Sequence, residues 1–330
     1  MRLRNQAIER LEHCFGKRTA ICVATQGAHR RVVRSPWASR EPTGGAAVGA
    51  WGHMRLFKLH GLGNDFLVLL DDGSTGPVEA GQARALCERR TGVGADGFIR
   101  SERAGDGAFS FELANADGSP AEMSGNGARC LGLAAARAGW WEDRSAPLIL
   151  RTPVGERQLE WQGGDLDEAE LRVGMGPVRP YKAPFDRGMP LLTDGDVGGG
   201  GGVGWMVDVG NPHAVGLLEG EMPPLEELEA VLGPVRSGKS EGDCNYEFVV
   251  RGPEAGALTM VVHERGVGWT QACGTGSVAA AWAAHQQGWV AKLVTVHNPG
   301  GTVEVDLSGP EARLGGRATF VATVEVDHLP

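Results

Sequence analysis

The chain has 330 residues, of which 42% are hydrophobic and 22% charged, and its formal net charge is -9 at pH 7. This length is sufficient for two domains that each bury a core. No stretch approaches the roughly 18 apolar residues of a membrane-spanning helix, and the net acidity argues against nucleic acid as a partner. A small zwitterionic ligand, whose charges are recognised locally, is compatible with this composition.

Residues 1–53 differ from the rest of the chain. They carry nine Lys and Arg against three Asp and Glu, and they end in a Gly/Ala-rich stretch without periodicity. Met54 then opens an alternating, strand-like run that reaches His60. We expect residues 1–53 to be a disordered extension or a misread start. An organelle-targeting peptide is the alternative, although the three acidic residues disfavour it.

The six cysteines form no CxxC pair and have no dense spacing; they are Cys14, Cys22, Cys87, Cys130, Cys244 and Cys273. Most of them are expected to be buried free thiols in a reducing compartment. No secretory pattern opens the chain. The expected localisation is therefore cytoplasmic.

Short β-rich segments alternate with a few helices from Met54 onward. Strands are expected at 65–70, 98–101, 109–114, 148–152, 169–173, 205–209, 246–251, 257–262, 294–297, 302–307 and 318–326. Helices are expected at 80–90, 125–138, 225–232 and 274–288. The second and fourth are rich in alanine, which suits a helix enclosed by a curled sheet. The fold class is therefore α+β, with mostly antiparallel sheets around central helices.

Two motifs occur twice, in the same order and at nearly the same spacing. Gly63-Asn64-Asp65-Phe66 resembles Gly210-Asn211-Pro212-His213. Ser124-Gly125-Asn126-Gly127 follows the first, and Cys273-Gly274-Thr275-Gly276 follows the second; an alanine-rich run comes after each. This repetition predicts a duplicated domain whose halves present one Ser and one Cys across a single cleft.

Cys273 lies where a helix is expected to begin. The positive end of the helix dipole should lower the pKa of its thiol. The flanking glycines let free backbone N–H groups approach a ligand, and such groups bind carboxylates. Ser124 offers the same backbone donors with a hydroxyl in place of the thiol. Cys130, six residues further along, is expected to pack in the core.

Charged residues near these helix starts are further candidates. Glu264 and Arg265 precede Cys273 closely, and next to an amino-acid pocket they could hold an ammonium and a carboxylate. His213 could tune a nearby thiol. A solvated ion pair and a structural histidine are the alternatives. The GxGxxG match over 92–97 precedes a strand instead of opening a helix, which disfavours dinucleotide binding. No cluster has metal-ligand spacing.

Six ordered motifs over residues 54–327 resemble the diaminopimelate epimerases. They are Lys58 to Phe66, Gly92 to Gly97, Asn115 to Gly118, Gly125 to Arg129, Asp208 to His213 and His263 to Ser277. The resemblance implies two pseudo-symmetric domains, each a sheet around a central helix: 54–170 plus 318–330, and 171–317. It also implies a homodimer and no cofactor.

The implied activity is the interconversion of LL- and meso-2,6-diaminopimelate by two-base Cα proton transfer, in lysine and peptidoglycan biosynthesis. Cys273 and Ser124 would be the catalytic pair, and His213 and Glu264 would adjust its acidity. The implied substrate-binding residues are Asn64, Gly97, Asn115, Gly125, Asn126, Asn211, Asn245, Glu264, Arg265, Gly274 and Thr275.

The sequence departs from the family pattern at three positions. Ser124 stands where members usually carry Cys, Gly97 where some have Gln, and Trp269 where Glu is common. A hydroxyl is a poorer acid and base than a thiol near neutral pH. Two alternatives follow: a related cofactor-free racemase or isomerase of the same fold, and a catalytically impaired amino-acid-binding homologue. Retention of Cys273 and both Gly-x-Gly starts favours an enzyme.

Overall fold

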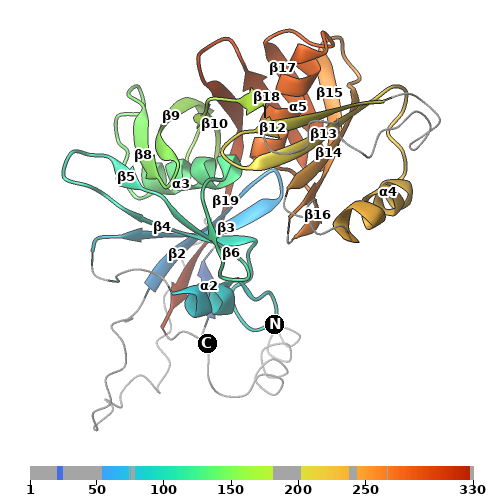
Figure 1. Ribbon diagram of the computed structural model, residues 1–330. Coiled ribbons are helices and arrows are strands. Elements are labelled where there is room, and N and C mark those ends of the chain that lie inside the picture. The colour runs from blue at the N-terminus through green and yellow to red at the C-terminus, as the bar shows by residue number, and fades with distance from the viewer. Residues whose placement is uncertain are drawn as a thin grey trace, which may run out of the picture.

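The computed structural model of the chain describes residues 21–24, 54–73, 75, 79–180, 202–237, 244–265 and 267–327, with 21–24 and 233–237 as backbone only. Figure 1 shows a strand-rich molecule with few helices. In the described part of the chain, no helix is long and apolar enough to cross a membrane.

The first group of strands surrounds one buried helix, α3 (Gly125–Arg137). Its strands are β2 (Met54–Gly61), β3 (Asn64–Asp71), β4 (Gly97–Glu102), β5 (Phe109–Ser110), β6 (Glu112–Asn115), β7 (Pro120–Ala121), β8 (Leu148–Thr152), β9 (Gly155–Gly164) and β10 (Glu168–Gly176). Helix α2 (Ala80–Cys87) connects β3 to the parallel β4.

The second group surrounds α5 (Gly274–Gln286). Its strands are β11 (Arg179–Pro180), β12 (Gly202–Asp208), β13 (Pro212–Leu218), β14 (Asn245–Arg251), β15 (Ala257–Glu264), β16 (Gly268–Thr270), β17 (Leu293–Asn298), β18 (Gly301–Asp306) and β19 (Ala312–Val326). Helix α4 (Leu225–Ser237) connects β13 to the parallel β14.

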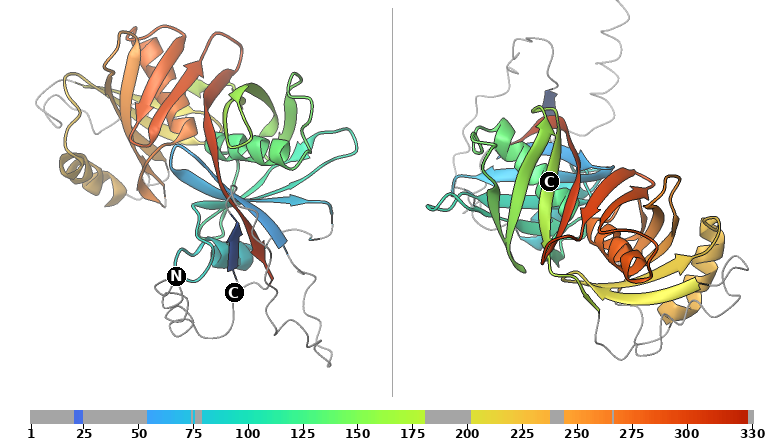
Figure 2. Two further views of the ribbon diagram at one scale, coloured as in Figure 1. Left: turned by 180° about the vertical axis from the view of Figure 1, so that it is seen from behind. Right: turned by 90° about the horizontal axis from the view of Figure 1, so that it is seen from above.

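The same strand pairings recur in both groups. An antiparallel hairpin, β2–β3 or β12–β13, is followed by a parallel neighbour, β4 or β14. A further antiparallel strand comes next, β6 or β15. Figure 2 shows β10 and β19 between the two groups. Strand β19 pairs with β10 along one edge and with β18 and β2 along the other, so it joins both groups into one hydrogen-bonded sheet.

Alanine and glycine allow the strands to approach both central helices closely. Residues 125–136 of α3 are all buried, as are most of those in α5. An ideal Cβ on Gly132 would lie 2.2 Å from a methyl carbon of Leu159 in β9. The expectation of Ala-rich helices enclosed by strands is thus confirmed for both segments, and Cys130 is fully buried as predicted.

Most expected elements are present, with shifted ends. Helix α2 ends at Cys87 instead of residue 90, and α4 continues past 232 to Ser237. The expected strand 109–114 is wrong as one element: β5 pairs with β8, whereas β6 pairs with β4. The chain changes partner at Phe111, whose N–H still donates to Arg151 O (2.9 Å).

The predicted domain limits fall inside continuous strands. Residues 170 and 171 are neighbours within β10, and residues 317 and 318 within β19. Of the predicted extension 1–53, only β1 (Ile21–Ala24) is described, and it pairs with the end of β19. The remainder lies outside the described residues.

The turn after β6 makes a close contact that tests this packing. Gly118 has a φ of +81°, and an ideal Cβ there would lie 2.2 Å from the carbonyl oxygen of Ala80 in α2. Gly107 has a nearly equal φ of +85° with nothing within 4 Å. We expect Gly107→Ala to lower the free energy of unfolding by about 1–2 kcal/mol, from backbone strain alone.

Gly118→Ala should cost about 1–3 kcal/mol more, because it adds a backbone clash. Chemical denaturation of both variants beside the wild type measures the difference. Equal losses would mean that α2 moves away from the turn without cost.

Candidate active site

The N-termini of α3 and α5 meet at the centre of the described structure. An ideal Cβ on Gly274 would lie 3.3 Å from Cα of Gly125. Ser124 and Cys273 are the N-cap residues of these helices, both in extended conformation. The sequence expectation that each precedes a helix start is therefore confirmed, and the two starts are adjacent.

Both N-cap side chains hold the first turn of their helix in the same way. Oγ of Ser124 accepts from the N–H of Gly127 at 3.1 Å, and Sγ of Cys273 accepts from the N–H of Gly276 at 3.4 Å. A helix leaves its earlier N–H groups without an acceptor of its own. In these two helices they belong to Gly125, Asn126, Gly274 and Thr275.

Asn126 links the two groups of strands. Its Nδ2 donates to Oδ1 of Asn64 and to the backbone oxygen of Ala272, both at 3.3 Å. Ala272 directly precedes Cys273, so this one amide reaches from the first helix start to the second. Its Oδ1 accepts from Nη2 of the fully buried Arg129, which fixes which way the amide faces.

Asn64 is held by a charged cluster. Its Nδ2 donates to Oδ2 of Asp96 at 3.2 Å. Arg89 bridges Asp96 and Asp65, at 2.7 and 2.8 Å, and Lys58 also contacts Asp65. Although burial alone would raise the pKa of Asp65, hydrogen bonds from Arg89 and Lys58 hold it well below its usual range. The loop around Asp96, which contains the GxGxxG match, therefore positions Asn64 and opens no helix.

His213 is the centre of a buried hydrogen-bonded group. Its Nδ1 lies 2.7 Å from Oε1 of Glu247, and its Nε2 lies 3.0 Å from Oδ1 of Asn211. The side chains of His213 and Glu247 are both fully buried. Glu247 was not among the residues predicted from sequence. It lies two residues after Asn245 in β14, and spacing along the chain does not reveal its contact with His213.

Cys273 and Glu264 lie within reach of each other. Glu264 accepts from the hydroxyl of Thr270 and interacts with Cys273, but burial outweighs these contacts and raises its pKa. Burial also raises the pKa of the Cys273 thiol well above its usual value, and the charges of Glu264 and Glu247 add to this. The expectation that the helix dipole lowers this pKa is thus wrong for the described conformation, because desolvation and two carboxylates outweigh the dipole.

Three further predicted residues, Asn245, Gly97 and Asn115, lie in strands. Asn245 in β14 is paired with His213 in the neighbouring parallel strand β13. Its Oδ1 accepts a hydrogen bond from the N–H of Arg265 at 2.9 Å. Gly97 and Asn115 are partners in the β4–β6 ladder. The side chain of Asn115 donates to Oγ of Ser119 at 3.0 Å.

Two of the positions expected to depart from the family pattern are Gly97 and Trp269. An ideal Cβ at Gly97 would lie 3.1 Å from both the Phe66 ring and the carbonyl oxygen of Ala114, so a side chain there would press on β3 and β6. Trp269 donates from Nε1 to Glu229 at 2.9 Å and therefore packs toward α4. Neither position supplies a side chain to the helix starts.

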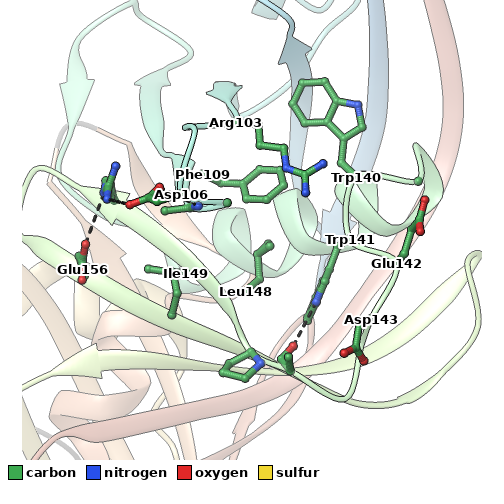
Figure 3. Close-up of a pocket in the computed structure, with 16 residues that line it drawn as sticks. Arg103, Asp106, Phe109, Trp140, Trp141, Glu142, Asp143, Leu148, Ile149 and Glu156 are labelled. Atoms are coloured by element: carbon green, nitrogen blue, oxygen red, sulfur yellow. Dashed lines mark hydrogen bonds and ion pairs between the residues drawn. The ribbon is translucent and has the colours of Figure 1, made fainter.

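A separate cavity of about 640 Å³ lies near the far end of α3. Figure 3 shows Arg103 beside Phe109 and Trp140, with Glu142 and Asp143 further along the wall. None of the predicted site residues lines it. The candidate active site is therefore the meeting point of the two helices.

Comparison with known proteins agrees with the motifs. The model of the diaminopimelate epimerase family matches residues 56–180 and 205–321. Diaminopimelate epimerase of Rhodococcus opacus (strain B4) is 37% identical over 295 residues, which cover 83% of this chain and 97% of that protein. The protein of the same name from Thermobifida fusca (strain YX) is 36% identical over 288 residues, covering 83% and 98%.

Solved structures share the fold at low identity. A phenazine biosynthesis protein of the PhzF family from Bacillus anthracis superposes with a TM-score of 0.59 at 15% identity, covering 84% of this chain and 99% of that one. A hydroxyproline epimerase from Agrobacterium vitis gives 0.57 at 16%, covering 84% and 91%. The resemblance predicted from motifs is confirmed: the chain belongs to the diaminopimelate epimerase family and is an isomerase of that family.

Proposed function

We propose that the protein interconverts LL- and meso-2,6-diaminopimelate in lysine biosynthesis, by removing the Cα proton from one face and returning a proton to the other. The observation that carries this proposal is the adjacency of two helix N-termini capped by Ser124 and Cys273. Inversion needs an acid and a base on opposite faces of one carbon, and each helix start offers one such side chain.

On this proposal the chain forms two pseudo-symmetric domains, 54–170 plus 318–330 and 171–317. They correspond to the two groups of strands except that β10 and β19 are each divided between them. The repeated order of antiparallel hairpin, parallel neighbour and central helix supports this division. Each domain then contributes one helix start to the same substrate.

The reacting carboxylate would accept hydrogen bonds from the free N–H groups of Gly125, Asn126, Gly274 and Thr275. These groups lie at two helix N-termini, where the dipoles favour negative charge. Negative charge moves onto this carboxylate as the Cα proton leaves, so donors fixed in advance lower the barrier most in the transition state.

Proton transfer would begin at Cys273. Its raised pKa keeps the thiol protonated, so a neighbouring base must first remove that proton, and Glu264 lies in contact with it. The thiolate then takes the Cα proton and becomes a thiol. Ser124 gives its hydroxyl proton to the opposite face of Cα. After product leaves, Ser124 regains a proton from solvent and Glu264 releases to solvent the one that it took from the thiol.

The distal amino-carboxylate end would be read by polar side chains around the helix starts. Their candidates are Asn64, Asn115, Asn211, Asn245, Glu264 and Arg265, while Gly97 can contribute only backbone atoms. The contacts of Asn64 with Asn126 and of Asn245 with the Arg265 backbone support a shared pocket.

The family resemblance further supports action without a cofactor, in the cytoplasm and as a homodimer. Among the described residues, Cys87, Cys130, Cys244 and Cys273 are free thiols, which suits a reducing compartment. Light scattering of the full chain tests the dimer, whose mass would be twice the 34.8 kDa of one chain.

The first prediction concerns Cys273. The full chain, incubated with LL-diaminopimelate in D2O, should exchange the Cα proton and form the meso isomer, as followed by NMR and chiral chromatography. Cys273→Ala should reduce both by at least about 10³-fold, because it removes the group that takes the proton. Cys87→Ala, at a buried thiol in α2, is the control and should retain activity. More than a few per cent of wild-type epimerisation by Cys273→Ala would reject the assignment.

The second prediction concerns Ser124. A thiol transfers protons more readily than a hydroxyl near neutral pH, so Ser124→Cys should keep or raise kcat. Ser124→Ala should reduce inversion about 10²-fold or more while exchange on the Cys273 face continues. The ratio of deuterium incorporation to meso product measures this separation. A folded but inactive Ser124→Cys variant would show that the first helix start does not carry the second proton-transfer group.

The third prediction concerns pH. Because burial raises the pKa of Glu264, activity should be lost on acidification at a pH above the ordinary glutamate value of about 4.3. Protonated Glu264 cannot accept the thiol proton, so kcat/KM falls as pH decreases through its pKa. Glu264→Gln should lower kcat about 10²-fold and remove this acid limb, whereas Glu226→Gln at the exposed start of α4 should change neither. An unchanged limb in Glu264→Gln would assign it to another group.

A further inference from the structure

Glu247 makes one strong contact and leaves one oxygen unused. Its Oε1 lies 2.7 Å from Nδ1 of His213. Its Oε2 is buried and has no hydrogen-bond partner among the described residues. An unsatisfied buried acceptor costs about 1–3 kcal/mol. A carboxylate retained at such a cost, away from solvent, points to a role other than stability.

The contact fixes the orientation of the His213 ring. An ionised carboxylate has no proton to give, so Nδ1 must donate to Glu247. The ring is then held at both nitrogens: Nε2 lies 3.0 Å from Oδ1 of Asn211, an amide oxygen that can only accept, so Nε2–H donates to it. Glu247 therefore determines both the rotamer and the Nδ1 protonation of His213, which lies in β13, a strand that packs against α5.

Glu247 also lies next to the thiol. An ideal Cβ on Gly276 would lie 2.7 Å from Oε1 of Glu247 and 3.3 Å from Sγ of Cys273. A side chain at residue 276 would displace either the Glu247 carboxylate or the Cys273 thiol. The absence of a side chain at Gly276, the second glycine of the Gly-x-Gly motif, therefore leaves room for the carboxylate. The charged and titratable groups that face Cys273 are thus Glu264 from β15, Glu247 from β14 and, through Glu247, His213 from β13.

The equivalent positions around Ser124 are apolar. In the first group of strands, Phe66 lies two residues after Asn64, as His213 lies two after Asn211. Ile99 lies two residues after Gly97, as Glu247 lies two after Asn245. An ideal Cβ on Gly127 would meet Cδ1 of Ile99 at 3.0 Å, where Gly276 would meet Glu247. The buried acid–imidazole pair therefore accompanies the thiol and has no counterpart at the hydroxyl.

We propose that Glu247 is a positioning residue of the Cys273 face: it holds His213 with a proton on Nδ1, while its own carboxylate lies close to the thiol. Only the expected effect of Glu247 on kcat rests on the proposed function. Its structural consequence, the state of His213, is measurable without substrate.

Two variants of Glu247 separate its hydrogen bond from its charge. Glu247→Gln keeps an oxygen that can accept from Nδ1 but removes the charge. Glu247→Ile installs the residue found at the equivalent position of the first half and removes the acceptor as well. Glu254→Gln is the matched control, because Glu254 contacts His297 at 2.8 Å in an exposed pair.

The substrate-free measurement is the 15N NMR spectrum of His213 in the full chain, assigned with His213→Gln. Wild type and Glu247→Gln should show a protonated Nδ1, and Glu247→Ile should lose that state. In addition, both variants should move the pH midpoint of Cys273 alkylation by iodoacetamide downward, because a negative charge beside the thiol is gone. Unchanged His213 signals in Glu247→Ile would overturn the proposal.

The kinetic measurement is epimerisation of diaminopimelate. Glu247→Ile should lower kcat about 10²-fold and Glu247→Gln about tenfold, with KM within about threefold, since Glu247 makes no substrate contact. Glu254→Gln should match wild type. A kcat of Glu247→Ile within twofold of wild type would also overturn the proposal. If no variant, including wild type, epimerises diaminopimelate, the proposed function fails while the NMR result still decides the role of Glu247.

Discussion

The meeting of two helix N-termini is the constraint on which the rest of the structure depends. Gly125 and Gly274 approach closely, since an ideal Cβ on Gly274 would lie 3.3 Å from Cα of Gly125. Each helix start carries roughly half a positive charge, and two such ends repel each other unless a negative group lies between them. The surrounding strands must therefore hold together an arrangement that the helices alone would not adopt.

Strand β19 is the main element that keeps the two helix starts together. Strand β19 contacts both α3 and α5 and pairs with strands of both groups. Its Leu314 lies beneath both helix starts, since an ideal Cβ on Gly125 or Gly274 would come within 2.5 or 2.9 Å of one of its methyl carbons. The relative position of the two catalytic candidates thus depends on a residue outside every motif. Apolar packing of Leu314 thus helps to set the distance between the two helix starts, where the motif residues lie.

Sequence was most informative where local chemistry decides the outcome. The Ala-rich helices, their N-caps and most strands follow from periodicity and turn residues, and the family follows from six ordered motifs. Glu247 was missed because its importance arises from a contact with His213 across two strands, which spacing along the chain does not reveal. The acidity expected for Cys273 was wrong because burial and two carboxylates are tertiary effects. The change of partner at Phe111 is likewise a property of the sheet.

Arg129 has a consequence for how the protein balances stability against binding. Its side chain is fully buried, contacts Asn126, and leaves Nε and Nη1 without a hydrogen-bond partner among the described residues. Burial lowers its pKa to about 10, so it still carries its charge at neutral pH. Two helix ends and a buried cation thus concentrate positive potential at one point. This positive potential lowers the stability of the ligand-free protein. An anionic ligand would neutralise it on binding, so part of the folding free energy lost in the free protein is recovered as binding affinity.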